Sequence, residues 1–302
     1  MWQHVLSRRQ THFAAIGAGV LIAAACAVTT VVEAAAGPQT LTVPSVRLYV
    51  LDCGLLKRGE PKNYQLTTEE VGGVTDFFNA CYLVVHPKGT LLWDTGIVLD
   101  ALVRPGGVEI PGNNFASKTL RSQLGEAGYA AADITYLAMS HSHADHIANA
   151  NDYAGSTWLI QRAEHATLFG GRPQAPGQAP SRIGPEANYI ALKDAKTVLL
   201  DGDHDLFGDG VVVIKSTPGH TPGHQSLFVK LAQTGPVLLS GDLYHYAAER
   251  TLKKIPVNDN QEQTQASRDT IDALLEQTGG QLWIQHDFVA STRQKRSPAY
   301  YE

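Results

Sequence analysis

The chain has 302 residues, of which 43% are hydrophobic and 18% are charged, and its formal net charge is −5 at pH 7. This hydrophobic share excludes an intrinsically disordered chain, and the length suffices for one large globular domain or two small ones. The acidic balance lacks the basic surface that nucleic acids require, so we expect no nucleic-acid partner.

The first 36 residues have the layout of an export signal. Arg8 and Arg9 precede a largely apolar stretch over 13–32, and Ala34-Ala35-Ala36 then offers small residues for cleavage. We therefore expect a signal peptide over 1–36, one mature domain over 37–302, a periplasmic or secreted protein, and no stable membrane insertion after cleavage. The alternative is an uncleaved anchor, because the apolar stretch approaches the roughly 20 residues that span a bilayer.

Two cysteines, Cys53 and Cys81, lie in the expected mature domain. Both fall in or beside predicted strands, at 46–53 and 80–86. In an oxidising compartment they could form a disulfide, but they could equally be two buried thiols that act as small hydrophobic residues. The sequence leaves both interpretations open.

The first half of the chain is rich in predicted strands. Short apolar runs bounded by turn residues predict strands over 46–53, 80–86, 90–93 and 134–139, and helical spacing predicts a helix over 117–128. Asp94 follows the third of these strands. It is either a turn residue, which Asp-x-Gly suits, or a hydrogen-bond partner of a metal-binding histidine.

A histidine cluster follows the strand predicted over 134–139. Ser140-His141-Ser142-His143-Ala144-Asp145-His146 contains three imidazoles and one carboxylate. A strand that ends in such a loop presents several ligands to one point, and these ligand types suit Zn²⁺ or a similar divalent ion. A polar, solvated loop does not account for the H-x-H-x-D-H spacing, so the segment predicts a metal site.

Strand signals return in the second half, over 157–161, 197–200, 211–215, 225–231, 236–239 and 281–285, with helices predicted over 163–169 and 261–277. Three of these strands lead to His220, Asp242 and His286. With the first cluster, four strand ends deliver His or Asp, which indicates a site along one edge of a sheet sandwich.

These motifs resemble those of the metallo-β-lactamase superfamily. The set consists of His141-x-His143-x-Asp145-His146, then Thr217-Pro218-Gly219-His220, Gly241-Asp242 and His286, in the family's order. The stretches 49–54, 81–83, 91–96 and 283–287 are similar to the N-acyl homoserine lactone lactonase branch. The resemblance implies an α/β fold, an αββα sandwich of two facing mixed β-sheets with outer helices.

The resemblance also implies two divalent metal ions per chain, with zinc as the expected metal. The positions that match the first site are His141, His143 and His220, those that match the second are Asp145, His146 and His286, and Asp242 matches the carboxylate that bridges both ions. Of the remaining histidines, His224 is expected to support a ligand or pack, while His86, His165 and His204 are expected to be surface or turn residues.

The activity that the resemblance implies is hydrolysis of the lactone ring of N-acyl homoserine lactones, which is quorum quenching. Two ions can share a hydroxide that attacks the ester carbonyl, because metal binding lowers the pKa of water from about 15.7 to near 7. Asp145 would carry a proton to the leaving group. His245 stands where lactonases of this branch have a Tyr that reaches the substrate carbonyl, and it is flanked by Tyr244 and Tyr246.

Two other functions compete with the lactonase. One is another metallo-hydrolase of this fold, acting on thioesters, organophosphate esters or β-lactams. It shares every metal ligand, so only the substrate pocket separates it from a lactonase. The other is a binding protein with an inactive site, against which the complete ligand set argues. We expect a small-molecule lactone as partner, and a homodimer is the family expectation.

Overall fold

The computed structural model describes residues 43–170 and 184–302, so the predicted signal peptide lies outside the described residues. Within those two ranges, no helix combines the length and the apolar character needed to cross a membrane.

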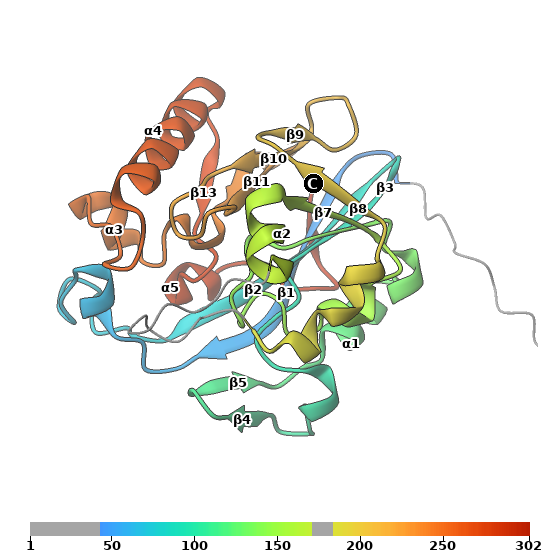
Figure 1. Cartoon of the computed structure of the whole chain (residues 1–302), viewed down its shortest axis with the longest axis horizontal. Helices are drawn as coiled ribbons and strands as arrows, with labels where there is room; N and C mark the ends of the chain where they lie inside the picture. Colours follow the sequence, from blue (N-terminus) through green and yellow to red (C-terminus); the bar gives the residue numbers. More distant parts are fainter. Residues whose placement is uncertain (1–42, 171–183) are drawn as a thin grey trace, which may run out of the picture. The chain divides into compact units, whose positions relative to one another are not determined.

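The larger of two β-sheets has the strand order β4-β5-β1-β2-β3-β6-β7-β8 (Figure 1). β14 pairs with β1 at Leu48 and Tyr49, whereas β5 pairs with the other end of β1, at Leu55 and Leu56. The pairs β3–β6, β6–β7 and β7–β8 are parallel and the others are antiparallel. The strands are β1 (Arg47–Leu56), β2 (Phe77–His86), β3 (Gly89–Trp93), β4 (Val108–Ile110), β5 (Asn114–Ala116), β6 (Tyr136–Ala138), β7 (Thr157–Gln161), β8 (Thr197–Leu200) and β14 (Tyr300–Tyr301).

The smaller sheet has the order β13-β12-β11-β10-β9, and its only parallel pair among the described strands is β12–β13. Its strands are β9 (His204–Asp205), β10 (Val212–Ser216), β11 (Gln225–Leu231), β12 (Gly235–Leu239) and β13 (Gln281–Trp283). Both sheets are therefore mixed, as predicted.

Helices cover the outer faces of the two sheets. Along β2, Tyr82 and Val84 pack toward the smaller sheet, whereas Leu83 and Val85 pack with Leu124 of α1 (Leu120–Glu126), because side chains alternate along a strand. Helix α2 (Arg162–Phe169) adds to that outer layer, and α4 (Gln261–Thr278) packs on the smaller sheet. Two shorter helices, α3 (Ala247–Leu252) and α5 (Phe288–Ser291), complete the set. This arrangement confirms the predicted αββα sandwich.

Capping residues determine where the two longest predicted helices begin, and where the second of them ends. The helix predicted over 117–128 begins only after Thr119, whose side chain accepts a hydrogen bond from the Ser122 amide. Helix α4 begins after Asn260, which caps it in the same way, and ends at Gly279 with a left-handed φ of 64°. The strand predicted over 281–285 is shorter than expected and stops at Trp283.

Cys53 and Cys81 form a disulfide between the neighbouring strands β1 and β2. The bond closes a loop of 28 residues, which stabilises the fold by about 3–4 kcal/mol in the chain-entropy model. It also lies under the loop that follows β3, since a Cβ on Gly96 would be 3.4 Å from the Cys53 Sγ. Of the two open interpretations of these cysteines, the structure shows the disulfide.

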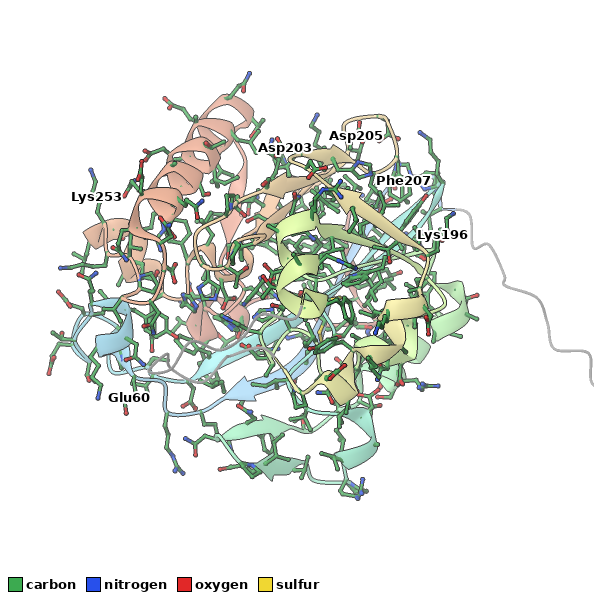
Figure 2. The ribbon with its side chains drawn as sticks, viewed as in Figure 1. Glu60, Lys196, Asp203, Asp205, Phe207 and Lys253 are labelled. Atoms are coloured by element: carbon green, nitrogen blue, oxygen red, sulfur yellow. A yellow bond between two sulfur atoms is a disulfide. The ribbon has the colours of Figure 1, made fainter. Side chains whose placement is uncertain are left out.

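The expectation that His86 is a surface or turn residue is wrong. His86 lies within β2 and is only 5% exposed. The connection between β9 and β10 covers it: the Phe207 ring stacks on the imidazole at 4.0 Å, and Asp209 Oδ2 lies 3.2 Å from His86 Nε2. Figure 2 shows Phe207 next to Asp205 at this edge of the molecule. By contrast, His165 in α2 and His204 in β9 are half-buried.

Candidate metal centre

The seven predicted ligands lie together in two groups. One group contains His141, His143, His220 and Asp242, and the other contains Asp145, His146, Asp242 and His286. Within each group the ligand atoms all lie within 4.8 Å of one another. The loops that carry them follow β6, β10, β12 and β13, so four strand ends meet at one edge of the sandwich.

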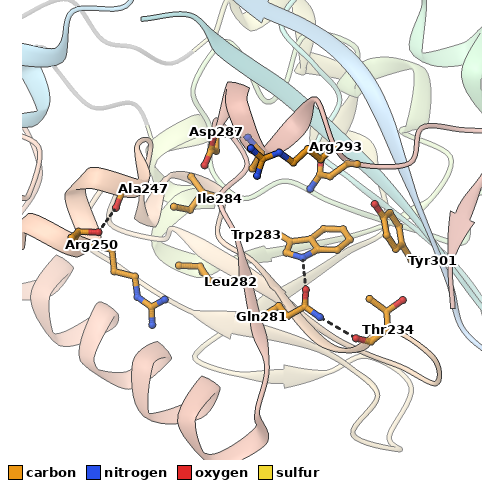
Figure 3. A pocket seen from close by; sticks show the side chains of 13 residues that line it. Thr234, Ala247, Arg250, Gln281, Leu282, Trp283, Ile284, Asp287, Arg293 and Tyr301 are labelled. Carbon is orange, nitrogen blue, oxygen red and sulfur yellow. Dashed lines mark hydrogen bonds between the residues drawn. The ribbon is translucent and has the colours of Figure 1, made fainter. Parts of the chain in front are cut away.

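A cavity of about 490 Å³ opens onto these groups. Its walls on the metal side are His143, Asp145, Asp242, His245 and His286, and its apolar walls are Leu56, Tyr64, Phe77 and Ile97. A second cavity of about 520 Å³ lies beside β13 and α5, where Trp283, Arg293 and Tyr301 line it (Figure 3). Because no predicted ligand lines this second cavity, the site chemistry belongs to the first.

Asp242 has the geometry of a bridging carboxylate. Its Oδ2 atom lies 3.3 Å from His220 Nε2 and 3.6 Å from His141 Nε2. Its Oδ1 atom lies 3.2 Å from His146 Nε2 and 3.1 Å from His286 Nε2. The two oxygens therefore face different ligand groups, one toward each.

The buried ligand atoms fit two divalent ions. Among the described residues, His141 Nε2, His146 Nε2 and Asp242 Oδ1 are buried without a hydrogen-bond partner. Such atoms are costly to bury unless something compensates them, and imidazole nitrogens that converge with carboxylate oxygens are the donor set of zinc-type ions. Burial lowers the pKa of both His141 and His143 well below the ordinary histidine value, which favours the neutral imidazole that binds metals. For His146, His220 and His286 the nearby carboxylates outweigh burial and raise the pKa, so a metal ion would have to displace a proton from these rings.

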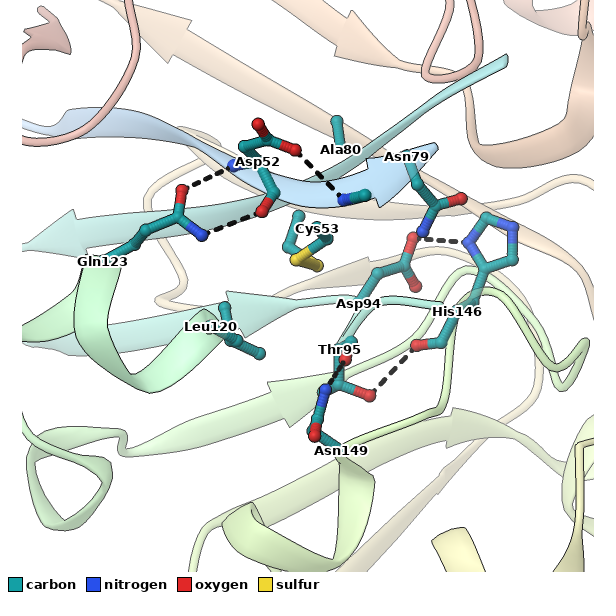
Figure 4. The surroundings of a disulfide bond; sticks show 12 residues. Asp52, Cys53, Asn79, Ala80, Asp94, Thr95, Leu120, Gln123, His146 and Asn149 are labelled. Carbon is teal, nitrogen blue, oxygen red and sulfur yellow. Dashed lines mark hydrogen bonds and ion pairs between the residues drawn. A yellow bond between two sulfur atoms is a disulfide. The ribbon is translucent and has the colours of Figure 1, made fainter. Parts of the chain in front are cut away.

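Asp94 supports a ligand and also occupies a turn. Its Oδ2 atom lies 2.9 Å from His146 Nδ1 (Figure 4). Its Oδ1 atom accepts a hydrogen bond of 2.6 Å from the Ser140 amide. Its φ of 61° is left-handed, as the turn after β3 requires. Both interpretations of Asp94 are therefore correct. The carboxylate orients His146 so that Nε2 faces the centre.

Three more ligands are oriented through their second ring nitrogen. His220 Nδ1 lies 3.0 Å from Asp259 Oδ1, His286 Nδ1 lies 2.9 Å from the Phe78 carbonyl oxygen, and His141 Nδ1 lies 3.0 Å from Ser140 Oγ. Each leaves Nε2 directed at the centre. His143 is reversed: its Nδ1 atom faces the centre, 3.0 Å from His220 Nε2.

His224 supports the bridging carboxylate and belongs to neither ligand group. Its Nε2 atom accepts a hydrogen bond of 2.9 Å from the Asp242 amide, and its Nδ1 atom lies 3.0 Å from the Thr217 carbonyl oxygen. Burial lowers the pKa of His224 to about 3, in keeping with a neutral ring that accepts at Nε2. A Cβ on Gly241 would come within 2.7 Å of this Nε2 atom, so only glycine fits beside it.

Sequence reasoning missed Glu164, a buried carboxylate in the first turn of α2. Its Oε1 atom accepts hydrogen bonds from the Ser142 amide and hydroxyl, at 2.8 and 2.6 Å. Its Oε2 atom accepts from the Thr221 hydroxyl and the Gly223 amide, at 2.8 and 3.0 Å. Glu164 thus ties the loop of His141 and His143 to the loop of His220. Nothing in the sequence marks it, because acidic residues are common in the first turn of any helix.

His245 lies at the centre but outside both ligand groups. Its Nε2 atom is 3.1 Å from Asp242 Oδ2, and its ring stacks on the His286 ring at 5.7 Å and 13°. Neither neighbouring tyrosine lines the cavity: Tyr244 packs under the Arg268 guanidinium, and Tyr246 packs against Phe77. Of the three candidates for the carbonyl donor, only His245 faces the cavity.

Known proteins resemble this chain over most of its length. A family model for the Metallo-beta-lactamase superfamily matches residues 74–279. The N-acyl homoserine lactonase AttM of Azorhizobium caulinodans is 27% identical over 266 residues, which are 85% of this chain and 99% of that protein.

Solved structures are similar as well. One is an N-acyl homoserine lactone hydrolase with the product N-hexanoyl-L-homoserine at its catalytic metal centre, with a TM-score of 0.69, 21% identity, and coverage of 85% of this chain and 100% of that one. Another is AidC, a dizinc quorum-quenching lactonase in complex with a product, with a TM-score of 0.57, 19% identity, and coverage of 85% and 94%. At these identities the likeness shows a shared fold.

Proposed function

This chain belongs to the metallo-beta-lactamase superfamily, and we propose that it is a dinuclear metal-dependent hydrolase that opens the lactone ring of N-acyl homoserine lactones. One observation carries the proposal. The two ligand groups are complete and share Asp242, whose two oxygens face different groups, in a chain related along 85% of its length to an N-acyl homoserine lactonase. Opening such a lactone destroys a bacterial signal, so the biological role would be quorum quenching.

We propose zinc as the metal, since the ligands are mostly imidazoles and AidC is a dizinc lactonase of the same fold. Two such ions, when bound, activate a water molecule and polarise the ester carbonyl. Side chains of the protein would transfer the proton and bind the carbonyl oxygen. Asp145 lines the cavity, and its Oδ2 atom lies 3.4 Å from both His146 Nε2 and His286 Nε2. This places its carboxylate to take up a proton and pass it to the leaving alkoxide.

His245 is the proposed donor to the carbonyl oxygen of the lactone. It lines the cavity, is 3% exposed, and directs Nε2 at the region of Asp242 where the ester would bind. Its backbone amide donates to Glu249 Oε1 at 2.8 Å, and Glu249 in turn pairs with buried Arg268 at 2.7 Å. These contacts fix the backbone of His245, and a donor that is preorganised for the transition state needs such a fixed position.

A substrate panel tests the proposed activity. We expect the metal-loaded protein to hydrolyse N-hexanoyl homoserine lactone much faster than a β-lactam, a thioester or an aryl phosphotriester, as followed by pH-stat titration. The same protein dialysed against a chelator should lose this activity and regain it with zinc. A fully metallated protein that opens no lactone, yet hydrolyses one of the other three compounds quickly, would refute the lactonase activity but not a two-metal hydrolase.

We also propose that the mature protein works outside the cytoplasm. The leader over 1–36 motivates this proposal, and the Cys53–Cys81 disulfide supports it because such bonds persist in oxidising compartments. N-terminal sequencing of native material should find a start near Gly37, and phenylalanine at both Ala34 and Ala36 should block that processing. Native protein that keeps Met1 would instead indicate a retained anchor.

A further inference from the structure

Three residues after β1, Lys57, Arg58 and Gly59, form part of the rim of the metal-centre cavity. One aromatic ring separates them from the metal ligands. A Cβ on Gly59 would lie 3.0 Å from Phe77 Cε2, and the Phe77 ring is 5.4 Å from the His286 ring. The Phe77 ring therefore lies between Gly59 and the ligand His286.

The backbone of this segment is fixed from two sides. The Lys57 amide donates to the Asn113 carbonyl, the Arg58 amide donates to Asp76 Oδ1, and the Gly59 amide donates to the Thr75 carbonyl, at 3.0, 2.8 and 2.8 Å. Held in this way, Arg58 has a left-handed φ of 58°, which is rare for a residue with a side chain. Glycine would adopt this conformation more readily, so the backbone does not explain an arginine here.

The two cations of the segment differ in their partners. Lys57 pairs with Glu109 at 2.7 Å and lies over the Phe115 ring at 4.2 Å. Arg58 is exposed, and its guanidinium has no hydrogen bond or ion pair within 4.0 Å in residues 43–170 and 184–302. A guanidinium has five N–H donors, so Arg58 offers this rim of the cavity a set of donors that the described protein does not use.

We propose that Arg58 donates to the acyl amide oxygen of the substrate and thereby makes the enzyme selective for N-acylated lactones over lactones with a plain alkyl chain. This inference rests on the proposed lactonase function. When the carbonyl of the lactone ring is at the metal centre, the substrate's acyl amide, which is attached to the next ring carbon, lies only a few atoms from the metal ligands. It therefore extends toward the walls of the cavity. On that rim, beside the apolar Leu56 and Phe77, Arg58 is the cation whose side chain forms no hydrogen bond or ion pair with the described residues.

The test uses metal-loaded protein and two substrates that differ only in the amide. N-hexanoyl homoserine lactone carries it, and α-heptyl-γ-butyrolactone has the same ring and chain length without it. Arg58→Gly should lower kcat/KM for N-hexanoyl homoserine lactone by about tenfold, mainly by raising KM. A tenfold loss equals about 1.4 kcal/mol, close to the contribution of a hydrogen bond from a charged donor. For the alkyl lactone the change should stay within about twofold.

Lys253→Gly is the matched control. Lys253 also has a left-handed φ, 53°, and is exposed at the end of α3, which it caps (Figure 2). It does not line the cavity. This variant should change kcat/KM for neither substrate. Both glycine variants should keep their metal content and their thermal midpoint, because glycine suits both backbone positions.

Binding measurements cover the case of a slow alkyl substrate. The inhibition constant of ring-opened N-hexanoyl homoserine should rise about tenfold in Arg58→Gly, and that of the ring-opened alkyl analogue should not. Equal effects on the amide and alkyl compounds, or no effect on either, would overturn the role of Arg58 while the lactonase stands. A wild-type protein that opens neither lactone would instead overturn the proposed function, and the Arg58 inference with it.

Discussion

Replacing Asp242 with alanine should remove most of the metal from both ligand groups at once. The carboxylate belongs to both groups, and its two oxygens lie 3.1–3.6 Å from the four histidines of the ligand groups that face it, His141, His146, His220 and His286. Elemental analysis after dialysis should find about two ions per chain in the wild type, as two-metal sites require, and fewer than about one in the variant. Lactone hydrolysis should fall by about three orders of magnitude, because metal activation supplies several kcal/mol and each 1.36 kcal/mol is tenfold.

Two further variants test whether Asp242 bridges both metal ions or binds only one of them. His286→Ala removes a ligand of the second group only, so it should retain about one ion per chain by the same elemental analysis. His204→Ala removes a histidine of β9 that belongs to neither group and should retain both ions. A pair of tightly held ions in Asp242→Ala would show that this carboxylate does not bridge.

The ligand positions were predictable because each belongs to a short motif at the end of a strand. His141, His143 and His146 follow β6 directly, and His220, Asp242 and His286 lie shortly after β10, β12 and β13. Strand ends can be recognised from apolar runs, and a fold that aligns them brings their loops together. The strand ends that carry His or Asp therefore follow from local sequence, whereas the αββα sandwich and the division of the ligands into two groups were predicted from the resemblance to the family.

The residues that hold the ligands in place were not predictable in the same way. Glu164 bonds to residues 22, 57 and 59 positions away, and Asp259 meets His220 across 39 positions. Such pairs depend on how loops far apart in the sequence meet, for which a single sequence carries no signal. The Cys53–Cys81 bond likewise depends on the register of β1 against β2.

Short elements of the cavity rim were also missed. Strands β4 and β5 have only three residues each, too few for a periodic pattern, yet the turn between them places Asn113 on the cavity. Asn113 in turn fixes Lys57, next to Arg58. The residues that would select the substrate thus come from the part of the fold that local pattern describes least.

His245→Ala should lower kcat for N-acyl homoserine lactones by about 10²–10³-fold, the usual cost of removing one donor that stabilises charge on a carbonyl oxygen. The metal content should stay near two ions per chain, because His245 belongs to neither ligand group. His245→Tyr should recover part of the lost kcat, since a phenol hydroxyl is also a donor. Stopped assays at saturating substrate, with metal analysis of the same samples, measure both quantities.

The competing role for His245 is to hold Asp242, because its Nε2 atom lies 3.1 Å from Asp242 Oδ2. In that case alanine would weaken metal binding by about 10–100-fold, as the loss of a partner that orients a ligand does, and added zinc would restore the activity. As a donor to the substrate, His245 leaves a kcat defect that zinc does not repair. Full recovery of His245→Ala in excess zinc would therefore reject the donor role, whereas a persistent defect that tyrosine partly relieves would establish it.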